Sequence, residues 1–342
     1  YQVSSLGIRD REIGAKGPDE FRILLLGDSF VFGYGLDPEQ TLSWCLKERL
    51  EADRELWPRQ MVVINGGVGG YAPWQELSLL RELAPKLKPD LVILQLLLSN
   101  DISETLVKAG KHLRAHNEKD TQARMLLFFY KGPLVRLHQW FYSYSAAYRA
   151  LWYTEAPPYL LVQSLQRLRF SRTSNLPRVL PSEERPVSLE TDLADWYPEL
   201  QEGAAMLAQD VRHIRDYCVE QGIDLIGFAV PAGQSVSEYW WRSVLREKTV
   251  YYEAGKDARV GEEIFADAAI PYVPLFPVFQ QSAYWYLLYF LHDLHFSPLG
   301  ADVVTAELAD YLKHVYLPGK LGLRAPVLEP GADRIRDAVR IR

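Results

Sequence analysis

The chain has 342 residues, of which 48% are hydrophobic and 24% charged, and its formal net charge at pH 7 is −6. This composition is typical of a globular protein with a sizeable core, and the acidic balance excludes the basic surface that nucleic-acid binders use. The only two cysteines in the sequence, Cys45 and Cys218, are too few for a disulfide framework or a metal cluster, and we expect both to be small buried core residues.

The N-terminal part of the sequence predicts strands that alternate with helices. Residues 1–20 are polar with scattered glycine, and we expect an extended lead-in laid over the surface. Short apolar runs, each ending in glycine or polar residues, predict buried strands of a parallel sheet. The predicted strands cover 21–27, 61–65 and 91–97, and the predicted helices cover 38–53, with proline at its first turn, and 73–87, with an apolar stripe.

The same alternation returns near residue 200. The predicted elements are a helix over 200–221, a strand over 223–230, a helix over 258–269, a strand over 270–275 and a helix over 298–314. This order favours a flavodoxin-like, three-layer α/β/α fold with a five-stranded parallel sheet. We therefore assign 21–102 and 200–316 to one α/β domain, and 317–342 to a polar C-terminal tail.

An insertion over 103–199 separates the two halves of this domain. Its part from 125 to 170 is dense in aromatic residues with interspersed arginine, whereas 171–198 is polar and rich in proline. We expect a mainly helical insertion packed on the sheet, followed by a long loop. The functional interpretations of 125–170 are a substrate wall, a docking face for a partner protein, or an amphipathic surface on a membrane.

A serine follows the first predicted strand in the motif Gly27-Asp28-Ser29. Open parallel sheets bind ligands at the carboxyl ends of their strands, so Ser29 is a candidate nucleophile if a base lies nearby. The alternative is that Asp28 and Ser29 only cap a following helix.

Three further segments with candidate site residues follow predicted strands or precede a predicted helix. A glycine turn, Gly66–Gly70, ends the second strand, Asn100 follows the third, and Asp293 and His295 precede the last helix. Ester chemistry needs an imidazole base, a carboxylate that orients it, and donors for the oxyanion. The glycine turn also looks like a phosphate loop, but it lacks the Lys-Ser/Thr ending of nucleotide sites, and we expect no cofactor.

Two histidines, His112 and His116, have the i,i+4 spacing of metal ligands on a helix. No acidic third ligand is evident near them, so a solvated helix face is the better interpretation. We expect no metal site.

The order of these blocks resembles the SGNH (GDSL-type) hydrolase superfamily, which includes bacterial esterases and O-acyltransferases. GDSF, a glycine turn, SND and a D-x-H motif follow one another within 21–101 and 290–312. The lead-in SLGIRDRE is similar to the segment that often precedes GDSF in exported bacterial SGNH domains. Because the chain also begins with Tyr1 rather than Met, we expect an extracytoplasmic protein, periplasmic or anchored by a segment that is not in this chain.

The resemblance implies an oxyanion hole with three donors. These are the N–H of Ser29, the N–H of Gly70 and the side-chain amide of Asn100. Gly69 lies one register away from Gly70 and is the alternative second donor.

The resemblance also implies His295 as the base and Asp293 as its partner, while Asp28 holds the turn. The sequence departs from the family pattern at two places. Leu98 stands where the third block usually has glycine, and the usual aspartate of the fourth block is replaced by His292, which leaves a D-x-H spacing.

The expected function is that of a serine esterase or O-acyltransferase acting on small acyl esters, with acetyl as the expected group. Acylated glycans are the expected substrates, because aromatic walls stack on sugar rings and related exported domains act on glycans. The alternative is an SGNH scaffold with reduced activity, whose segment 125–170 docks onto a partner protein or a membrane.

Overall fold

The computed structural model describes residues 2–52, 60–111, 191–192, 194–233, 235–236, 253–281, 288–290 and 295–320. These residues all belong to one of two compact units, which comprises Tyr1–Leu113, Val187–Phe290 and Leu294–Arg342. The aromatic segment 125–170, the pair His112 and His116, His292 and Asp293 lie outside the described residues.

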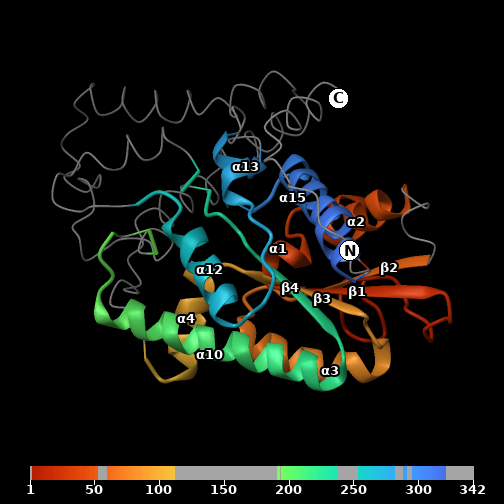
Figure 1. The fold of residues 1–342 in the computed structure, drawn as a ribbon, viewed down its shortest axis with the longest axis horizontal. Coiled ribbons are helices and arrows are strands. Elements are labelled where there is room, and N and C mark those ends of the chain that lie inside the picture. The colour runs from red at the N-terminus through yellow and green to blue at the C-terminus, as the bar shows by residue number, and fades with distance from the viewer. Residues whose placement is uncertain are drawn as a thin grey trace, which may run out of the picture. The chain divides into compact units, whose positions relative to one another are not determined.

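The centre of the described fold is a parallel sheet of four strands in the order β2-β1-β3-β4 (Figure 1). The strands are β1 (Glu20–Gly27), β2 (Gln60–Gly67), β3 (Leu91–Leu96) and β4 (Asp224–Ala229). The order reverses direction at β1, so that β1 and β3 flank a topological switch point, where sheets of this kind bind ligands. The α/β class and the first four predicted strands are confirmed.

The predicted fifth strand, 270–275, is wrong as a strand among the described residues. Its place holds a single parallel bridge between Gly227 and Tyr272. The Gly227 N–H donates to the Pro271 carbonyl at 2.8 Å, and the Val273 N–H returns to Gly227 at 2.8 Å. Prolines at 271 and 274 remove the neighbouring donors, and a ladder cannot extend past residues that lack an N–H.

Helices cover both faces of the sheet and bury two apolar cores (Figure 1). One core receives α2 (Leu42–Glu51) and α15 (Pro298–Tyr311), and the other receives α3 (Pro73–Leu87), α4 (Leu98–Lys108), α10 (Pro198–Gln221) and α12 (Lys256–Asp267). Alternate residues of β1 serve the two cores: Ile23 and Leu25 face one, Leu24 and Leu26 the other. A strand buried on both faces explains the unbroken apolar run in the sequence.

Several helix boundaries differ from the predicted ones. The predicted helix 38–53 begins as a short 3₁₀ turn, η1 (Pro38–Gln40), and α2 starts only after Thr41. The reason is local, since the Thr41 hydroxyl accepts the Trp44 N–H at 3.4 Å and so caps α2. Among the described residues, α4 directly after β3 and α13 (Phe276–Gln281) are helices that were not predicted. Beyond α15 the helix continues through η3 (Leu312–Tyr316) into α16 (Leu317–Lys320).

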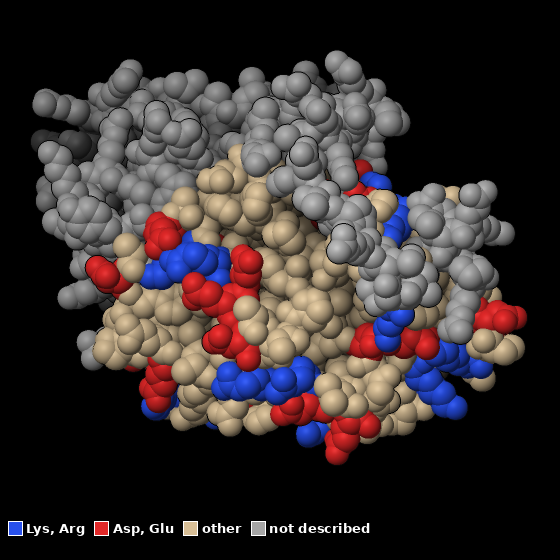
Figure 2. All heavy atoms as spheres, viewed as in Figure 1, with Lys and Arg blue, Asp and Glu red and all other residues tan. Residues whose placement is uncertain are grey.

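Three further observations concern the surface charge, the two cysteines and membrane-spanning helices. On the face shown in Figure 2, basic and acidic side chains are interspersed around an uncharged area. Cys218 is buried, and burial raises the pKa of its thiol to about 12, whereas Cys45 is only half-buried, so its predicted core position is wrong. No helix within the described ranges combines the length and the apolar content that a membrane span requires.

Candidate active site

Ser29 lies at the carboxyl end of β1 as the first residue of α1 (Ser29–Phe32). The buried Asp28 caps this short helix, because its carboxylate accepts the Phe30 N–H at 2.9 Å. The Asp28 N–H donates to the Gln95 side-chain oxygen on β3 at 3.0 Å. The capping interpretation of Asp28 is therefore correct, and the cap also holds Ser29 at the switch point between β1 and β3.

The His295 imidazole meets the Ser29 hydroxyl at this edge of the sheet. The His295 Nε2 lies 2.7 Å from the Ser29 Oγ, although 266 positions separate the two residues in the chain. The backbone around His295 is held on both sides: its carbonyl accepts the Phe290 N–H at 2.7 Å, and Ser297 caps α15. A hydroxyl and an imidazole within hydrogen-bond reach have the geometry that a nucleophile–base pair requires.

Two aromatic rings flank the His295 imidazole. The ring centroids of Phe30 and Tyr34 each lie 5.0 Å from that of His295, with interplanar angles of 36° and 41°. The Phe30 side chain is buried at 7% exposure, whereas Tyr34 is 55% exposed. The imidazole is thus packed by an apolar ring on the core side and by an accessible ring on the solvent side.

The glycine turn after β2 lies beside the serine. The Tyr71 N–H closes this turn onto the Val68 carbonyl at 3.1 Å, and Gly70 adopts a φ of 78°, which favours glycine. A Cβ placed on Gly69 would lie 4.0 Å from the Ser29 Cβ, whereas one on Gly70 would meet nothing within 4 Å. The closing hydrogen bond uses neither the Gly69 nor the Gly70 N–H, so both remain candidate oxyanion donors.

Asn100 connects the third block to this turn. It lies in the first turn of α4, and its side-chain amide donates to the Tyr71 carbonyl at 3.3 Å. Leu98, which replaces the usual glycine, begins α4 with its side chain buried at 2% exposure. The Asp101 carboxylate accepts the Leu97 N–H at 2.8 Å and so fixes the start of the helix. The substitution at 98 therefore still leaves Asn100 at the switch-point edge.

Three buried carboxyl groups lie behind these donors: Asp28, Glu76 and Asp101. Burial raises the pKa of Asp28 to about 6, while the Phe30 N–H and the charge of His295 act in the opposite direction. Burial raises the pKa of Glu76 well above its usual value, and the negative charges of Asp101 and Asp28 raise it further. Neither carboxyl oxygen of Glu76 has a hydrogen-bond partner among the described residues, so its environment favours the neutral acid.

The N-terminal lead-in supports the serine from behind. The Arg9 guanidinium is 8% exposed and donates to the carbonyls of Phe32 at 2.9 Å, Gly33 at 2.5 Å and Leu36 at 2.6 Å. The Phe32 and Gly33 carbonyls lie at the end of α1 and the Leu36 carbonyl lies in the turn after it, and a buried acceptor that loses a donor costs stability. Arg9 thus positions the short helix that carries Ser29.

The sequence prediction missed several residues of this site: Arg9, Phe30, Tyr34, Glu76 and Gln95. Gln95 carried a signal, because it is the one polar residue in the apolar run LVILQLL. Arg9 lies in the lead-in SLGIRDRE, whose resemblance to exported SGNH domains gave this arginine no role of its own. Among the described residues, no three His, Cys, Asp or Glu side chains are arranged to hold a metal ion.

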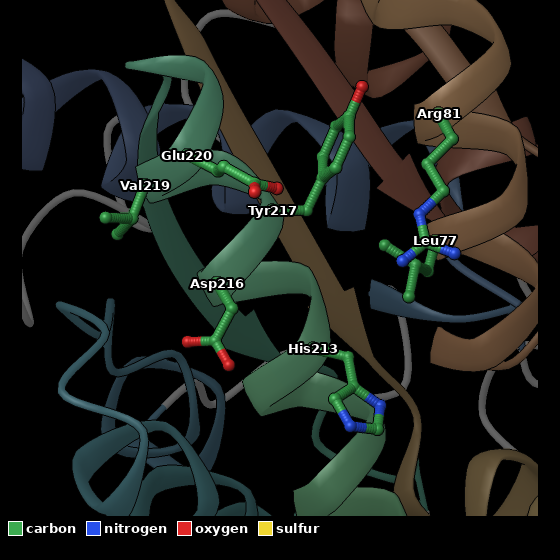
Figure 3. Close-up of a pocket in the computed structure, with 7 residues that line it drawn as sticks. All are labelled: Leu77, Arg81, His213, Asp216, Tyr217, Val219 and Glu220. Atoms are coloured by element: carbon green, nitrogen blue, oxygen red, sulfur yellow. The ribbon is translucent and has the colours of Figure 1, made fainter.

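A surface groove between α3 and α10 lies apart from the serine (Figure 3). It is lined by Leu77, Arg81, His213, Asp216, Tyr217, Val219 and Glu220. The Arg81 guanidinium lies 5.9 Å from the centre of the Tyr217 ring. Most of the lining belongs to the last turns of α10, which lead into the amino end of β4, opposite the edge that carries Ser29.

No protein-family model and no curated protein matches the chain. Among solved structures it is similar to a lipase/acylhydrolase from Enterococcus faecalis, with 15% identity, a TM-score of 0.42 and coverage of 90% of this chain and 100% of that one. It is also similar to a G-D-S-L family lipolytic protein from Desulfitobacterium hafniense (10% identity, TM-score 0.40, 84% and 97% covered). A third is the SGNH-hydrolase family esterase AlinE4 (13% identity, TM-score 0.35, 76% and 79% covered).

These similarities are distant, so the description of the fold depends on the chain's own features. The strand order β2-β1-β3-β4 sets a switch point at β1, and GDSF, the glycine turn and SND all lie at that edge. The segment before α15 adds His295, in contact with Ser29. The described part of the chain therefore has an α/β/α fold in which the sequence blocks that resemble the SGNH pattern meet at one edge of the sheet.

Proposed function

We propose that this protein is a serine ester hydrolase with Ser29 as nucleophile and His295 as general base. The observation that carries the proposal is the 2.7 Å contact between the Ser29 Oγ and the His295 Nε2. The position of this pair at the switch point of the sheet supports it, since substrates of open α/β proteins bind there.

The first half of the reaction follows from these positions. His295 Nε2 takes the proton of the Ser29 hydroxyl as Oγ attacks the carbonyl carbon of the ester, and the electron pair of the C=O bond moves to oxygen. The resulting oxyanion is stabilised by the N–H of Ser29, the N–H of Gly70 or Gly69, and the amide of Asn100. A single such donor is typically worth about 3–4 kcal/mol of activation free energy. When the tetrahedral intermediate collapses, the proton passes from His295 to the leaving alkoxide.

The second half reverses these roles. Water, or a second hydroxyl group, attacks the acyl-serine while His295 removes its proton, and the Ser29 oxygen leaves with that proton. Attack by water gives hydrolysis, and attack by another alcohol gives O-acyl transfer. We include Asp293 in the proposal as the partner of His295, and small acyl groups such as acetyl, carried on sugar hydroxyls, as substrates.

A fluorophosphonate probe tests the nucleophile directly, because it reacts with activated serines and needs no knowledge of the substrate. We expect the intact protein to label at Ser29, and Ser29→Ala and His295→Ala to remain unlabelled while keeping the thermal unfolding midpoint. Labelling that survives in Ser29→Ala would refute the assignment.

The reduced-activity scaffold remains the second candidate from the sequence. A folded protein that neither labels nor hydrolyses nitrophenyl acetate, yet co-purifies with a partner through 125–170, would favour it over the enzyme. Co-purification should then be lost on deletion of 125–170 and kept in Ser29→Ala.

A further inference from the structure

The Tyr34 side chain is an exposed ring held at the site by its backbone. Its N–H donates to the Ser29 carbonyl at 3.1 Å, and the glycines on either side, Gly33 and Gly35, both adopt a φ of 80°. The backbone therefore leaves α1 in a tight turn that directs residue 34 outward. The ring remains 55% exposed although its centroid is only 5.0 Å from that of His295. Core packing does not account for an aromatic side chain in this position.

The roles proposed for Ser29 and His295 determine which part of an ester substrate lies next to the Tyr34 ring. In the proposed reaction His295 Nε2 delivers its proton to the leaving alkoxide, so the alcohol oxygen must lie against the imidazole. The carbonyl oxygen points instead toward the donors at Gly70 and Asn100. A ring that flanks the imidazole therefore borders the alcohol part of the ester and not its acyl part.

We propose that Tyr34 is a binding platform for a ring-shaped alcohol, and that it selects esters whose leaving group is a pyranose or another ring with an apolar face. The inference rests on the proposed function and assigns recognition of the ring-shaped alcohol to one residue. A flat aromatic face offers a large apolar area to a ring stacked on it, whereas a flexible acyclic alcohol covers little of that face. The Phe30 ring on the core side is buried and unavailable for this role.

The test compares two acetate esters in Tyr34→Ala, Tyr34→Phe and the wild-type full chain. The ring ester is methyl 6-O-acetyl-glucopyranoside, and the acyclic ester is 2-methoxyethyl acetate, whose leaving alcohol is also primary. We expect Tyr34→Ala to lower kcat/KM for the ring ester about tenfold, mainly through KM, and to lower it less than about threefold for the acyclic ester. Tyr34→Phe keeps the ring face and should retain the wild-type preference for the ring ester. Tyr217→Ala, at the opposite edge of the sheet, is the control and should change neither ester.

The outcomes separate this inference from the proposed function. Equal losses on both esters in Tyr34→Ala would mean that the ring only packs on His295, which overturns the platform. Wild-type protein that hydrolyses the acyclic ester but shows no preference for the ring ester overturns it as well. Failure of the wild type on both esters, together with absent fluorophosphonate labelling, would remove the proposed function itself and the platform with it.

Discussion

Two serines near the carboxyl edge of the sheet, Ser29 and Ser235, each hydrogen-bond a titratable side chain, but the two contacts have different roles. After β1, the Ser29 Oγ lies 2.7 Å from the His295 imidazole. After β4, the Ser235 Oγ donates to the Asp192 carboxylate at 2.5 Å. Burial raises the pKa of Asp192 to about 8, and the negative charge of Asp257 adds to the effect. A carboxyl group that holds its own proton at neutral pH cannot take one from serine, whereas an imidazole can.

The cluster around Ser235 instead fastens a loop. The Asp257 carboxylate accepts the Ala232 N–H at 2.9 Å, and the Asp192 carbonyl accepts the Glu253 N–H at 2.7 Å. Ser235 is 1% exposed, so a substrate has no access to its hydroxyl. A serine hydroxyl that hydrogen-bonds a titratable side chain is therefore a candidate nucleophile only if that side chain can accept its proton and a substrate can reach it.

Removal of each hydroxyl in turn tests whether the two serines differ in role. Ser29→Ala should lower ester turnover by about a thousandfold or more, because the variant lacks the hydroxyl that is proposed to carry the acyl group. Ser235→Ala should keep kcat within about twofold and lower the free energy of unfolding by roughly 1–3 kcal/mol, because a buried acceptor loses its donor. Turnover and denaturant unfolding measure the two effects. Similar activity losses in both variants would show that the clusters do not differ in role.

The support of α1 by the lead-in gives the next largest effect. Arg9→Ala leaves the carbonyls of Phe32, Gly33 and Leu36 without their charged donor, and we expect a loss of roughly 1–3 kcal/mol in stability together with slower fluorophosphonate labelling of Ser29. The exposed Arg11, two positions on, is the matched control and should tolerate alanine. An unchanged labelling rate in Arg9→Ala would show that Arg9 does not position Ser29.

The glycine turn can be tested against a glycine far from the site. Gly70 and Gly222, the latter at the end of α10, have φ of 78° and 66°, and a Cβ on either would meet nothing within 4 Å. Alanine at either position should therefore cost a similar strain of roughly 1–2 kcal/mol. We expect only Gly70→Ala to lower kcat, because relief of that strain moves the candidate oxyanion donors. Equal kcat values in the two variants would argue against donors in this turn.

The prediction with the smallest effect on ester turnover concerns the pH dependence of stability at the loop cluster. The raised pKa of Asp192 means that the folded protein holds a proton which the unfolded chain releases near pH 4. The folded state therefore binds more protons between about pH 4 and pH 8, and this group makes stability fall as pH rises through that window.

Asp192→Asn mimics the neutral acid and should remove that fall, so that the variant gains stability relative to wild type at pH 8 but not at pH 4. Urea unfolding at the two pH values measures the difference. An effect independent of pH would indicate that Asp192 is ionised in the folded protein. Ester turnover at a fixed pH should stay near the wild-type rate, in contrast to Ser29→Ala.

Local patterns in the sequence were sufficient to predict several strands and turns. Apolar runs that stop at Gly27 and before Gly66 predicted β1 and β2, because a strand buried on both faces must be apolar throughout. The Pro38 signal placed a helix start too early, since Thr41 offers a stronger cap three residues later. The predicted strand at 270–275 failed because the prolines that flank Tyr272 and Val273 remove ladder donors.

The family resemblance had paired Ser29 with His295, but contacts between distant residues are visible only in the tertiary structure. The contact of Ser29 with His295 spans 266 positions, and that of Arg9 with the end of α1 joins the lead-in to a helix more than 20 residues away. The exposed ring of Tyr34 beside the imidazole has no local signature either. Strand and turn formation follow from nearest neighbours in the chain, whereas a site at a switch point is assembled by the packing of segments whose separation no local pattern encodes.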